Sequence, residues 1–165
     1  MIKNVIASLL IALAFLSNGC SKVPVTGRCQ LNLVKNSEII PASFEQYEQV
    51  KKESKLSNDQ EQIALVRNVG TRIQKAVEKY MNDNGWGKEL EGYAWEFNLI
   101  DEEMVNAWAI PGGKVAFDTG IMPICKDEKG IAVVMGHEVA HAIANHGRER
   151  MSQSMAAQYG LRQFS

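Results

Sequence analysis

The amino-acid sequence predicts an α+β domain that is mainly helical and carries a small antiparallel sheet. Three features indicate this fold class: an apolar stripe with helical spacing, a segment that alternates with the period of a strand, and a second helical segment towards the C-terminus. The 165 residues suffice for one domain, and a hydrophobic content of 45% is ordinary for a globular protein. With 18 basic and 19 acidic residues, the chain lacks the charge excess of many nucleic-acid-binding proteins. We therefore expect no nucleic-acid partner.

The first twenty residues have the features of an export signal. Lys3 supplies a positive charge, and an apolar run from Val5 to Leu16 follows that is too short to span a bilayer as a finished helix. The run ends before Ser17-Asn18-Gly19-Cys20, which resembles a lipobox, the signal that directs acylation of a bacterial cysteine. The match is imperfect, because the aliphatic residue lies four positions before the cysteine rather than three.

This interpretation divides the chain into three segments. We expect residues 1–19 to be a lipoprotein signal peptide, residues 20–36 a lipidated arm or linker, and residues 37–165 the folded part. Lipidation of Cys20 would anchor the protein to a membrane, since each buried methylene contributes about 0.8 kcal/mol; simple secretion is the alternative. Ser21 resembles the sorting signals of enterobacterial lipoproteins that reach the outer membrane. The expected location is therefore the cell envelope, at the outer membrane and facing the periplasm.

Two cysteines remain if Cys20 is lipidated. An oxidising compartment would permit a disulfide between Cys29 and Cys125, but their spacing has no signature, so the pairing stays open. Neither cysteine belongs to a CxxC pair, which excludes a cysteine zinc site.

Two helix starts follow the arm. Ser43 to Gln46 and Ser57 to Gln60 each have the serine-to-glutamine spacing of a capping box. The second opens the stronger helix, because apolar residues then recur at steps of three and four until Asn82-Asp83-Asn84-Gly85 ends it. The apolar residues of this stripe are Ile63, Val66, Val69, Ile73, Ala76, Val77 and Tyr80. We expect the stripe to face the core and neither helix to carry catalytic residues.

The period changes to that of strands after Gly92. Large apolar side chains at positions 93, 95, 97 and 99 alternate with their neighbours, which predicts a first strand. A second extended stretch, Asn106 to Ile110, meets the turn Pro111-Gly112-Gly113, and Lys114 to Phe117 continue beyond it. These signals predict a small antiparallel sheet with a hairpin, whose edge could also receive a peptide as an added strand.

A last helix is expected to begin at residue 127 or 128 and to run to about residue 145, with Gly147 placed to end it. It contains His137 and His141, which lie four residues apart. This spacing rotates the side chain by about 40° net, so both imidazoles project from one face, one turn apart. Two histidines placed in this way can bind one metal ion.

The segment His137-Glu138-Val139-Ala140-His141 has the HExxH pattern of zinc metalloproteases. We expect His137 and His141 to be zinc ligands. Glu138 follows the first ligand directly, so its carboxylate can approach a zinc-bound water without entering the coordination shell and can act as the general base. The alternative, a pair of buried core histidines, is weaker because the motif lies on a predicted helix that follows predicted strands.

His146 is the third histidine of the chain. It lies nine residues beyond His137, a net rotation of about 180°, so on an unbroken helix it faces away from the metal. Metzincins bend the chain with a glycine before a third histidine, but residues 142–145 contain no such glycine. We therefore expect a structural role for His146 at the helix C-terminus, where a histidine suits the helix dipole.

Three segments together resemble one peptidase family: HEVAHAIANHGRERMSQ at the motif, NAWAIPGGKVAFDTGIM before it, and PVTGRCQLNLV after Cys20. From Cys20 onwards the chain is similar to the gluzincin metallopeptidases of family 48, and in particular to their periplasmic lipoprotein branch. The resemblance implies a zincin-like fold, one zinc ion per chain held by His137 and His141, and Glu138 as the catalytic acid and base. It also implies an endopeptidase that acts on misfolded envelope proteins.

The resemblance further places a substrate cleft along the strand before the motif. A polypeptide substrate is expected to add to this strand and to be held mainly through its backbone groups. The expected substrate-binding residues are Asn106, Ala107, Trp108, Ala109, Ile110, Pro111, Gly112 and Gly113. Nothing in the sequence indicates an oligomeric state.

The chain departs from the family in its metal ligands. Family members take a third zinc ligand from a glutamate on a later helix, whereas Glu149 is the one carboxylate after His141 in this sequence. Glu149 lies eight residues on, about 12 Å along the axis if the helix persists, and needs a sharp bend to reach the same metal. We therefore interpret residues 37–165 as the N-terminal part of a metalloprotease catalytic domain, incomplete at its C-terminus. An inactive fragment and a chaperone-like protein that binds polypeptides without cutting them are the alternatives.

Overall fold

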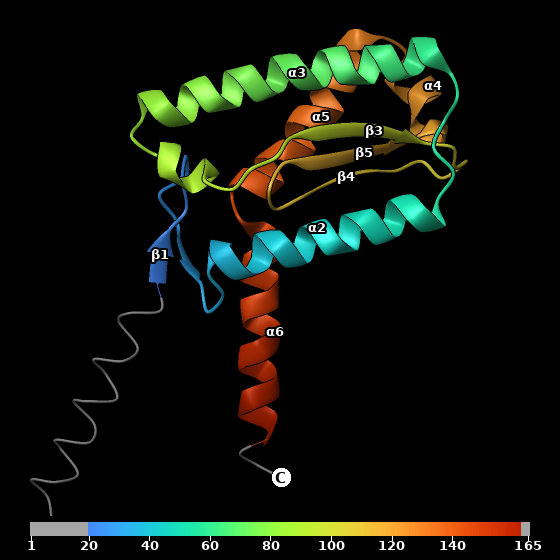
Figure 1. The fold of residues 1–165 in the computed structure, drawn as a ribbon. Coiled ribbons are helices and arrows are strands. Elements are labelled where there is room, and N and C mark those ends of the chain that lie inside the picture. The colour runs from blue at the N-terminus through green and yellow to red at the C-terminus, as the bar shows by residue number, and fades with distance from the viewer. Residues whose placement is uncertain (1–19, 163–165) are drawn as a thin grey trace, which may run out of the picture.

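The computed structural model describes residues 20–162, so the predicted signal peptide, residues 1–19, lies outside the described residues. The elements are β1 Cys20–Lys22, β2 Cys29–Leu31, α2 Asn36–Glu53, α3 Gln60–Asp83, β3 Glu96–Ile100, β4 Ala107–Ile110, β5 Lys114–Asp118, α4 Met122–Cys125, α5 Glu128–Ile143 and α6 His146–Arg162, with short 3-10 helices at Gly87–Leu90 and Thr119–Ile121. A three-stranded sheet lies between α2 on one side and α3 and α5 on the other (Figure 1). This mainly helical α+β architecture confirms the predicted fold class.

The helix α2 begins at Asn36 rather than at Ser43. The backbone N–H of Lys35 donates a hydrogen bond to the Glu38 carboxylate at 3.3 Å, which closes the first turn. Ser43 and Pro41 both lie inside the helix, and Ser43 is buried. The capping pattern at Ser43 is inactive because the helix has already begun when the chain reaches it.

The helix α3 confirms the stronger helix prediction, with a different cap. The Asp59 carboxylate accepts hydrogen bonds from two backbone N–H groups of the first turn at 3.1 and 3.0 Å. The Ser57 hydroxyl, the predicted cap, instead accepts one from the N–H of Asp59 at 3.2 Å. The helix ends at Asp83, within the predicted stop signal.

The sheet is mixed, with the strand order β3-β5-β4, and in this detail the predicted antiparallel sheet is corrected. β4 and β5 form the predicted antiparallel hairpin, whereas β3 pairs in parallel with β5. The chain leaves β3, runs back along the outer strand β4 and returns as β5 in the gap between them. Alternation identifies strands without specifying which of them are neighbours, so the parallel pairing left no local signal.

The two faces of the sheet pack against different helices. The main core lies between the sheet and the helices α3 and α5, and its sheet residues are Phe97, Leu99, Val115 and Phe117. Val66 and Val69 of the predicted stripe are 1% and 2% exposed, which confirms that this stripe faces the core. On the other face, Tyr47 of α2 packs with Ile100 and Ala116.

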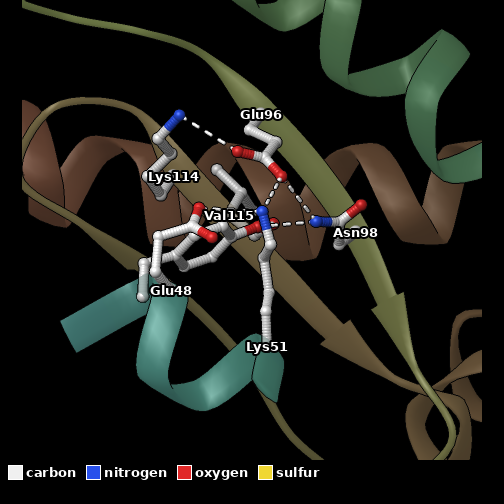
Figure 2. Close-up of polar contacts among 7 residues, drawn as sticks. Glu48, Lys51, Glu96, Asn98, Lys114 and Val115 are labelled. Carbon is white, nitrogen blue, oxygen red and sulfur yellow. Dashed lines mark hydrogen bonds and ion pairs between the residues drawn. The ribbon is translucent and has the colours of Figure 1, made fainter. Parts of the chain in front are cut away.

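A polar cluster joins α2 to this second face of the sheet. Glu96 accepts hydrogen bonds from Lys51 at 2.9 Å, from Lys114 at 3.0 Å and from Asn98 at 2.9 Å (Figure 2). Burial alone would raise the pKa of the Glu96 carboxyl, but these hydrogen bonds outweigh burial and lower the pKa. The Tyr47 hydroxyl extends the cluster by donating to a β5 carbonyl at 3.3 Å. These contacts hold α2 in a defined position on the sheet.

The predicted arm begins with an antiparallel hairpin formed by β1 and β2. Val23 and Gln30 in this hairpin are buried, so it packs on the rest of the protein. Cys125 is free and buried in the main core, and it therefore does not form the disulfide with Cys29 that the sequence left open.

The last helix, α6, extends away from the sheet past the start of α2 (Figure 1). Within residues 20–162, no helix combines the length and the apolar character that crossing a membrane requires.

Candidate metal centre

The motif lies on α5, whose start and inner face are both fixed. The Asp127 carboxylate caps the helix by accepting hydrogen bonds from the N–H groups of Lys129 and Gly130 at 2.9 and 3.0 Å, where the sequence predicts the start. The inner face of α5 is buried in the main core through Ile131, Met135, Val139 and Ile143. The outer face is therefore left for the histidines.

His137 and His141 are both exposed, and they project from one face of α5, as their spacing predicts. Their Nε2 atoms lie 3.0 Å apart, and their ring centroids lie 4.5 Å apart. Two nitrogens that each bind a zinc ion at about 2.0–2.1 Å in tetrahedral geometry are about 3.3 Å from one another. The pair therefore fits two positions of a zinc shell with little movement, and solvent can reach both nitrogens.

Glu138 is half-buried and follows His137 on the same helix. The HExxH pattern predicts that its carboxylate lies near a metal held by the two histidines without being one of the ligands. In the part of the chain that the structure describes, no three histidine, cysteine or carboxylate side chains come together to hold a metal. The described residues thus fit two zinc ligands and one nearby carboxylate.

α5 ends at Ile143, earlier than predicted, because Asn145 adopts a left-handed backbone conformation with φ of 57°. The N–H groups of Ala144 and Asn145 donate to carbonyls of the last turn at 2.9 and 3.1 Å and close the helix. Asparagine tolerates this conformation better than most residues, so it makes the bend for which the sequence offers no glycine. A new helix then begins at His146, and Gly147 lies inside it rather than ending α5.

His146 does not face away from the histidine pair, and the prediction that it would is wrong. Its Nδ1 lies 2.5 Å from Nδ1 of His141, with the ring centroids 4.8 Å apart. The prediction assumed an unbroken helix, and the bend at Asn145 removes that condition. His146 thus meets the nitrogen of His141 that does not face His137.

Glu149 is held by an arginine from the other end of the chain. Its two carboxylate oxygens accept hydrogen bonds from Arg28 at 2.8 and 2.6 Å. The hydrogen bond from the Arg28 guanidinium lowers the pKa of the Glu149 carboxyl. This bidentate pair fastens the N-terminal hairpin to α6.

The turn of the N-terminal hairpin forms one wall of the metal centre. Pro24, Val25 and Thr26 line a hollow of about 230 Å³ together with all three histidines. Val25 also borders a second, almost wholly apolar hollow of about 450 Å³ between α3 and α5. Sequence reasoning missed this wall because the contact joins segments more than a hundred residues apart.

Part of the predicted substrate strand lies beside His141. β4 is at the edge of the three-stranded sheet. Ala109, Ile110 and Pro111 line a hollow of about 200 Å³ that also includes His141. Ala107 and Trp108 precede them on the same edge strand.

The other predicted substrate residues have neighbours elsewhere. Gly112 lies against the Phe44 ring of α2, and Gly113 lies against the Trp95 ring. The carbonyl of Asn106 accepts a hydrogen bond from the N–H of Asp118 at 3.0 Å. These three residues flank β4 rather than lining the hollow beside His141.

With this geometry, comparison with known proteins assigns the chain to a family. The model of Peptidase family M48 matches residues 68–164, which is more than half of the chain and includes most of α3, the three-stranded sheet and the histidine pair. The chain belongs to Peptidase family M48. Family M48 consists of zinc-dependent metallopeptidases. The match confirms two predictions from the sequence: that the chain belongs to this family, and that it is a peptidase by its motif.

Curated relatives in family M48 are longer proteins. The Mitochondrial metalloendopeptidase OMA1 of Saccharomyces cerevisiae is 29% identical over 153 residues, which cover 86% of this chain and 44% of the relative. The protein of the same name from Schizosaccharomyces pombe is 44% identical over 62 residues, covering 38% and 18%. That of Arabidopsis thaliana is 36% identical over 83 residues, covering 50% and 17%. The chain thus matches less than half the length of each of these relatives.

These relatives correct the predicted branch and location. All three are named as mitochondrial proteins, as are the Bos taurus and Homo sapiens relatives. The predictions of the periplasmic lipoprotein branch and of an outer-membrane location facing the periplasm are therefore wrong. The signal peptide and the lipidation of Cys20 gain no support from these relatives. The N-terminal pattern is short, so it carries little information about the branch of the family or the location of the protein.

Proposed function

We propose that this chain carries the catalytic centre of a zinc-dependent metalloendopeptidase, with residues 37–165 as part of its catalytic domain. The observation that carries the proposal is the 3.0 Å separation of the His137 and His141 Nε2 atoms, with Glu138 next to the first histidine. When bound, zinc would polarise the scissile carbonyl and acidify the attacking water. Glu138 would accept the proton of that water on a carboxylate oxygen and pass it to the leaving amine nitrogen. Membership in family M48 supports this chemistry.

We further propose that the substrate is an extended polypeptide that adds to β4. In an antiparallel pair, every second residue directs its backbone N–H and C=O groups to the partner strand. Asn106 is hydrogen-bonded to β5, so the backbone groups of Trp108 and Ile110 also point to β5. The N–H and C=O groups of Ala107 and Ala109 are then directed to the open edge of the sheet. These backbone groups would bind a substrate with little regard to its sequence.

Two features favour an unfolded substrate. An edge strand can bind a peptide only if the peptide is extended and free of its own partners. The apolar hollow between α3 and α5 shares Val25, Ala140 and Ile143 with the hollow at the histidines, so it can receive apolar side chains near the scissile bond. Folded proteins bury such side chains, whereas unfolded ones expose them.

The Glu138→Gln variant tests the proposed reaction. The amide keeps the size of the side chain and both histidines, but it cannot accept the water's proton. We expect zinc content to match the wild type while zinc-dependent internal cleavage of casein, an unfolded polypeptide, falls by about 10²–10⁴-fold. A wild-type protein that binds zinc and casein without cleaving it would instead support the alternative of a polypeptide-binding protein.

The Ala109→Pro variant tests the binding strand. Proline removes the N–H that faces the open edge and leaves the hydrogen bonds between β4 and β5 in place. We expect the KM for casein to rise while the zinc content stays unchanged. Ala109→Ser, which keeps the N–H, is the matched control, and equal KM values for the two variants would exclude β4 as the binding strand.

A further inference from the structure

His141 has a different histidine at each of its ring nitrogens. Its Nε2 lies 3.0 Å from Nε2 of His137, and its Nδ1 lies 2.5 Å from Nδ1 of His146. The rings of His141 and His146 are tilted by 54°. The two Nδ1 atoms are close enough to share a hydrogen bond.

This arrangement determines where the ring protons lie when His141 binds a metal. A nitrogen that binds a metal carries no proton, so a neutral His141 that offers Nε2 keeps its proton on Nδ1. The Nδ1–H group can then donate to Nδ1 of His146, which accepts it when its own proton is on Nε2. A hydrogen bond in this direction favours the tautomer of His141 that binds metal.

The start of α6 holds His146 in this place. The bend at Asn145 brings its ring back to α5, and two contacts then fix the helix that follows. Arg148 donates to the Asn36 side chain at 2.8 Å, and the Ser152 hydroxyl accepts from the N–H of Leu33 at 3.0 Å. Both contacts tie α6 to the segment around the start of α2, so the position of His146 does not depend on a metal.

We propose that His146 is a positioning residue of the metal centre: it fixes the ring orientation and the tautomer of the ligand His141. The inference rests on the proposed function, because it requires His137 and His141 to bind a metal. His146 meets the nitrogen of His141 that is turned away from His137, so it supports the ligand from behind and is not a third ligand. Partners of this kind typically change metal affinity by about 10–100-fold.

Titration of the metal-free chain with Co²⁺, followed by its visible absorption bands, tests this role. We expect His146→Ala to weaken Co²⁺ binding by about 10–100-fold. His146→Asn should recover most of the affinity, because its Oδ1 lies at nearly the same distance from the backbone as Nδ1 and can accept the same hydrogen bond. Gln153→Ala, at an exposed position of α6, should bind Co²⁺ as the wild type does.

The outcomes separate this inference from the proposed function. Equal affinities of the wild type and His146→Ala, or an Asn variant as weak as the Ala variant, would overturn the positioning role and leave the metal site intact. If the wild type itself binds no Co²⁺, the metal site fails and the inference fails with it. Circular dichroism of each variant verifies that the helices are retained.

Nitrogen-15 NMR of the histidine rings gives a second readout that needs no metal. In the metal-free wild type, we expect the proton of His141 on Nδ1. In His146→Ala, the proton should move largely to Nε2, and His146→Asn should return it to Nδ1. A wild-type His141 with its proton on Nε2 would contradict the proposed hydrogen bond.

Discussion

Arg28 in the N-terminal hairpin and Glu149 in α6 are joined by two hydrogen bonds of 2.8 and 2.6 Å across 121 positions of sequence. The same hairpin carries Val25, which lines the hollow at the histidines, and the same helix begins with His146. This one ion pair therefore links a wall of the metal centre to the helix that positions His141.

The Glu149→Gln variant should be less stable than the wild type at neutral pH and equally stable in acid. The folded-state pKa of Glu149 lies below its ordinary value of 4.5, because Arg28 stabilises the charged form. Such a group contributes stability above the unfolded-state pKa, and the contribution is lost as the pH falls through the folded-state pKa. Thermal unfolding of both proteins from pH 7 to pH 3 measures the difference.

The control for this variant is Glu45→Gln, which changes an exposed glutamate of α2. Its thermal stability should differ little from that of the wild type over the same pH range. If the difference in thermal stability between Glu149→Gln and the wild type is the same at pH 3 as at pH 7, the charge of Glu149 does not contribute to stability through Arg28.

The elements that sequence predicted well are those whose signals are local. Each of these signals depends on residues only a few positions apart in the sequence. They are the stripe from Ile63 to Tyr80, the turn Pro111-Gly112-Gly113 and the spacing of His137 and His141. The mixed strand order could not be predicted in this way, because it depends on which strands meet after the chain collapses.

The position of His146 shows a second limit of local signals. A glycine before His146 would have predicted a bend. Asparagine adopts the left-handed conformation less often than glycine does, so Asn145 is only a weak signal for a bend. The contacts that complete the site, from Val25 to the histidines and from Arg28 to Glu149, join the two ends of the described chain. No periodicity or spacing encodes such contacts.

Glycine should be tolerated better than alanine at Asn145, and alanine better than glycine at the neighbouring Ala144. Asn145→Ala should destabilise the protein by about 1–2 kcal/mol, because alanine pays the steric cost of a positive φ, whereas Asn145→Gly should retain the bend at lower cost. At Ala144, with φ of −72°, glycine should instead be the destabilising residue, by about 0.5–1 kcal/mol. Urea unfolding measures all three variants, and an Asn145→Ala variant as stable as the wild type would contradict the strain at this bend.

The close contact between α3 and the sheet predicts a large effect of a single methyl group. In Gly70→Ala the new Cβ overlaps the Phe97 ring, and overpacking of this kind costs about 1–3 kcal/mol. Gly136→Ala in α5 is the matched change, because no heavy atom lies within 4 Å of its added Cβ. It should stabilise the helix by about 0.5–1 kcal/mol. Urea unfolding curves should therefore move in opposite directions, and two shifts of the same sign would contradict the packing described for α3.

Zinc titration of the wild type, His137→Ala, His141→Ala and the double variant tests the central claim most directly. The 3.0 Å separation of the two Nε2 atoms predicts about one zinc ion per chain, shared by both rings. We expect each single variant to bind zinc more weakly than the wild type, and the double variant to lose the site. A double variant that binds one zinc ion with wild-type affinity would contradict the account and place the metal elsewhere in the chain.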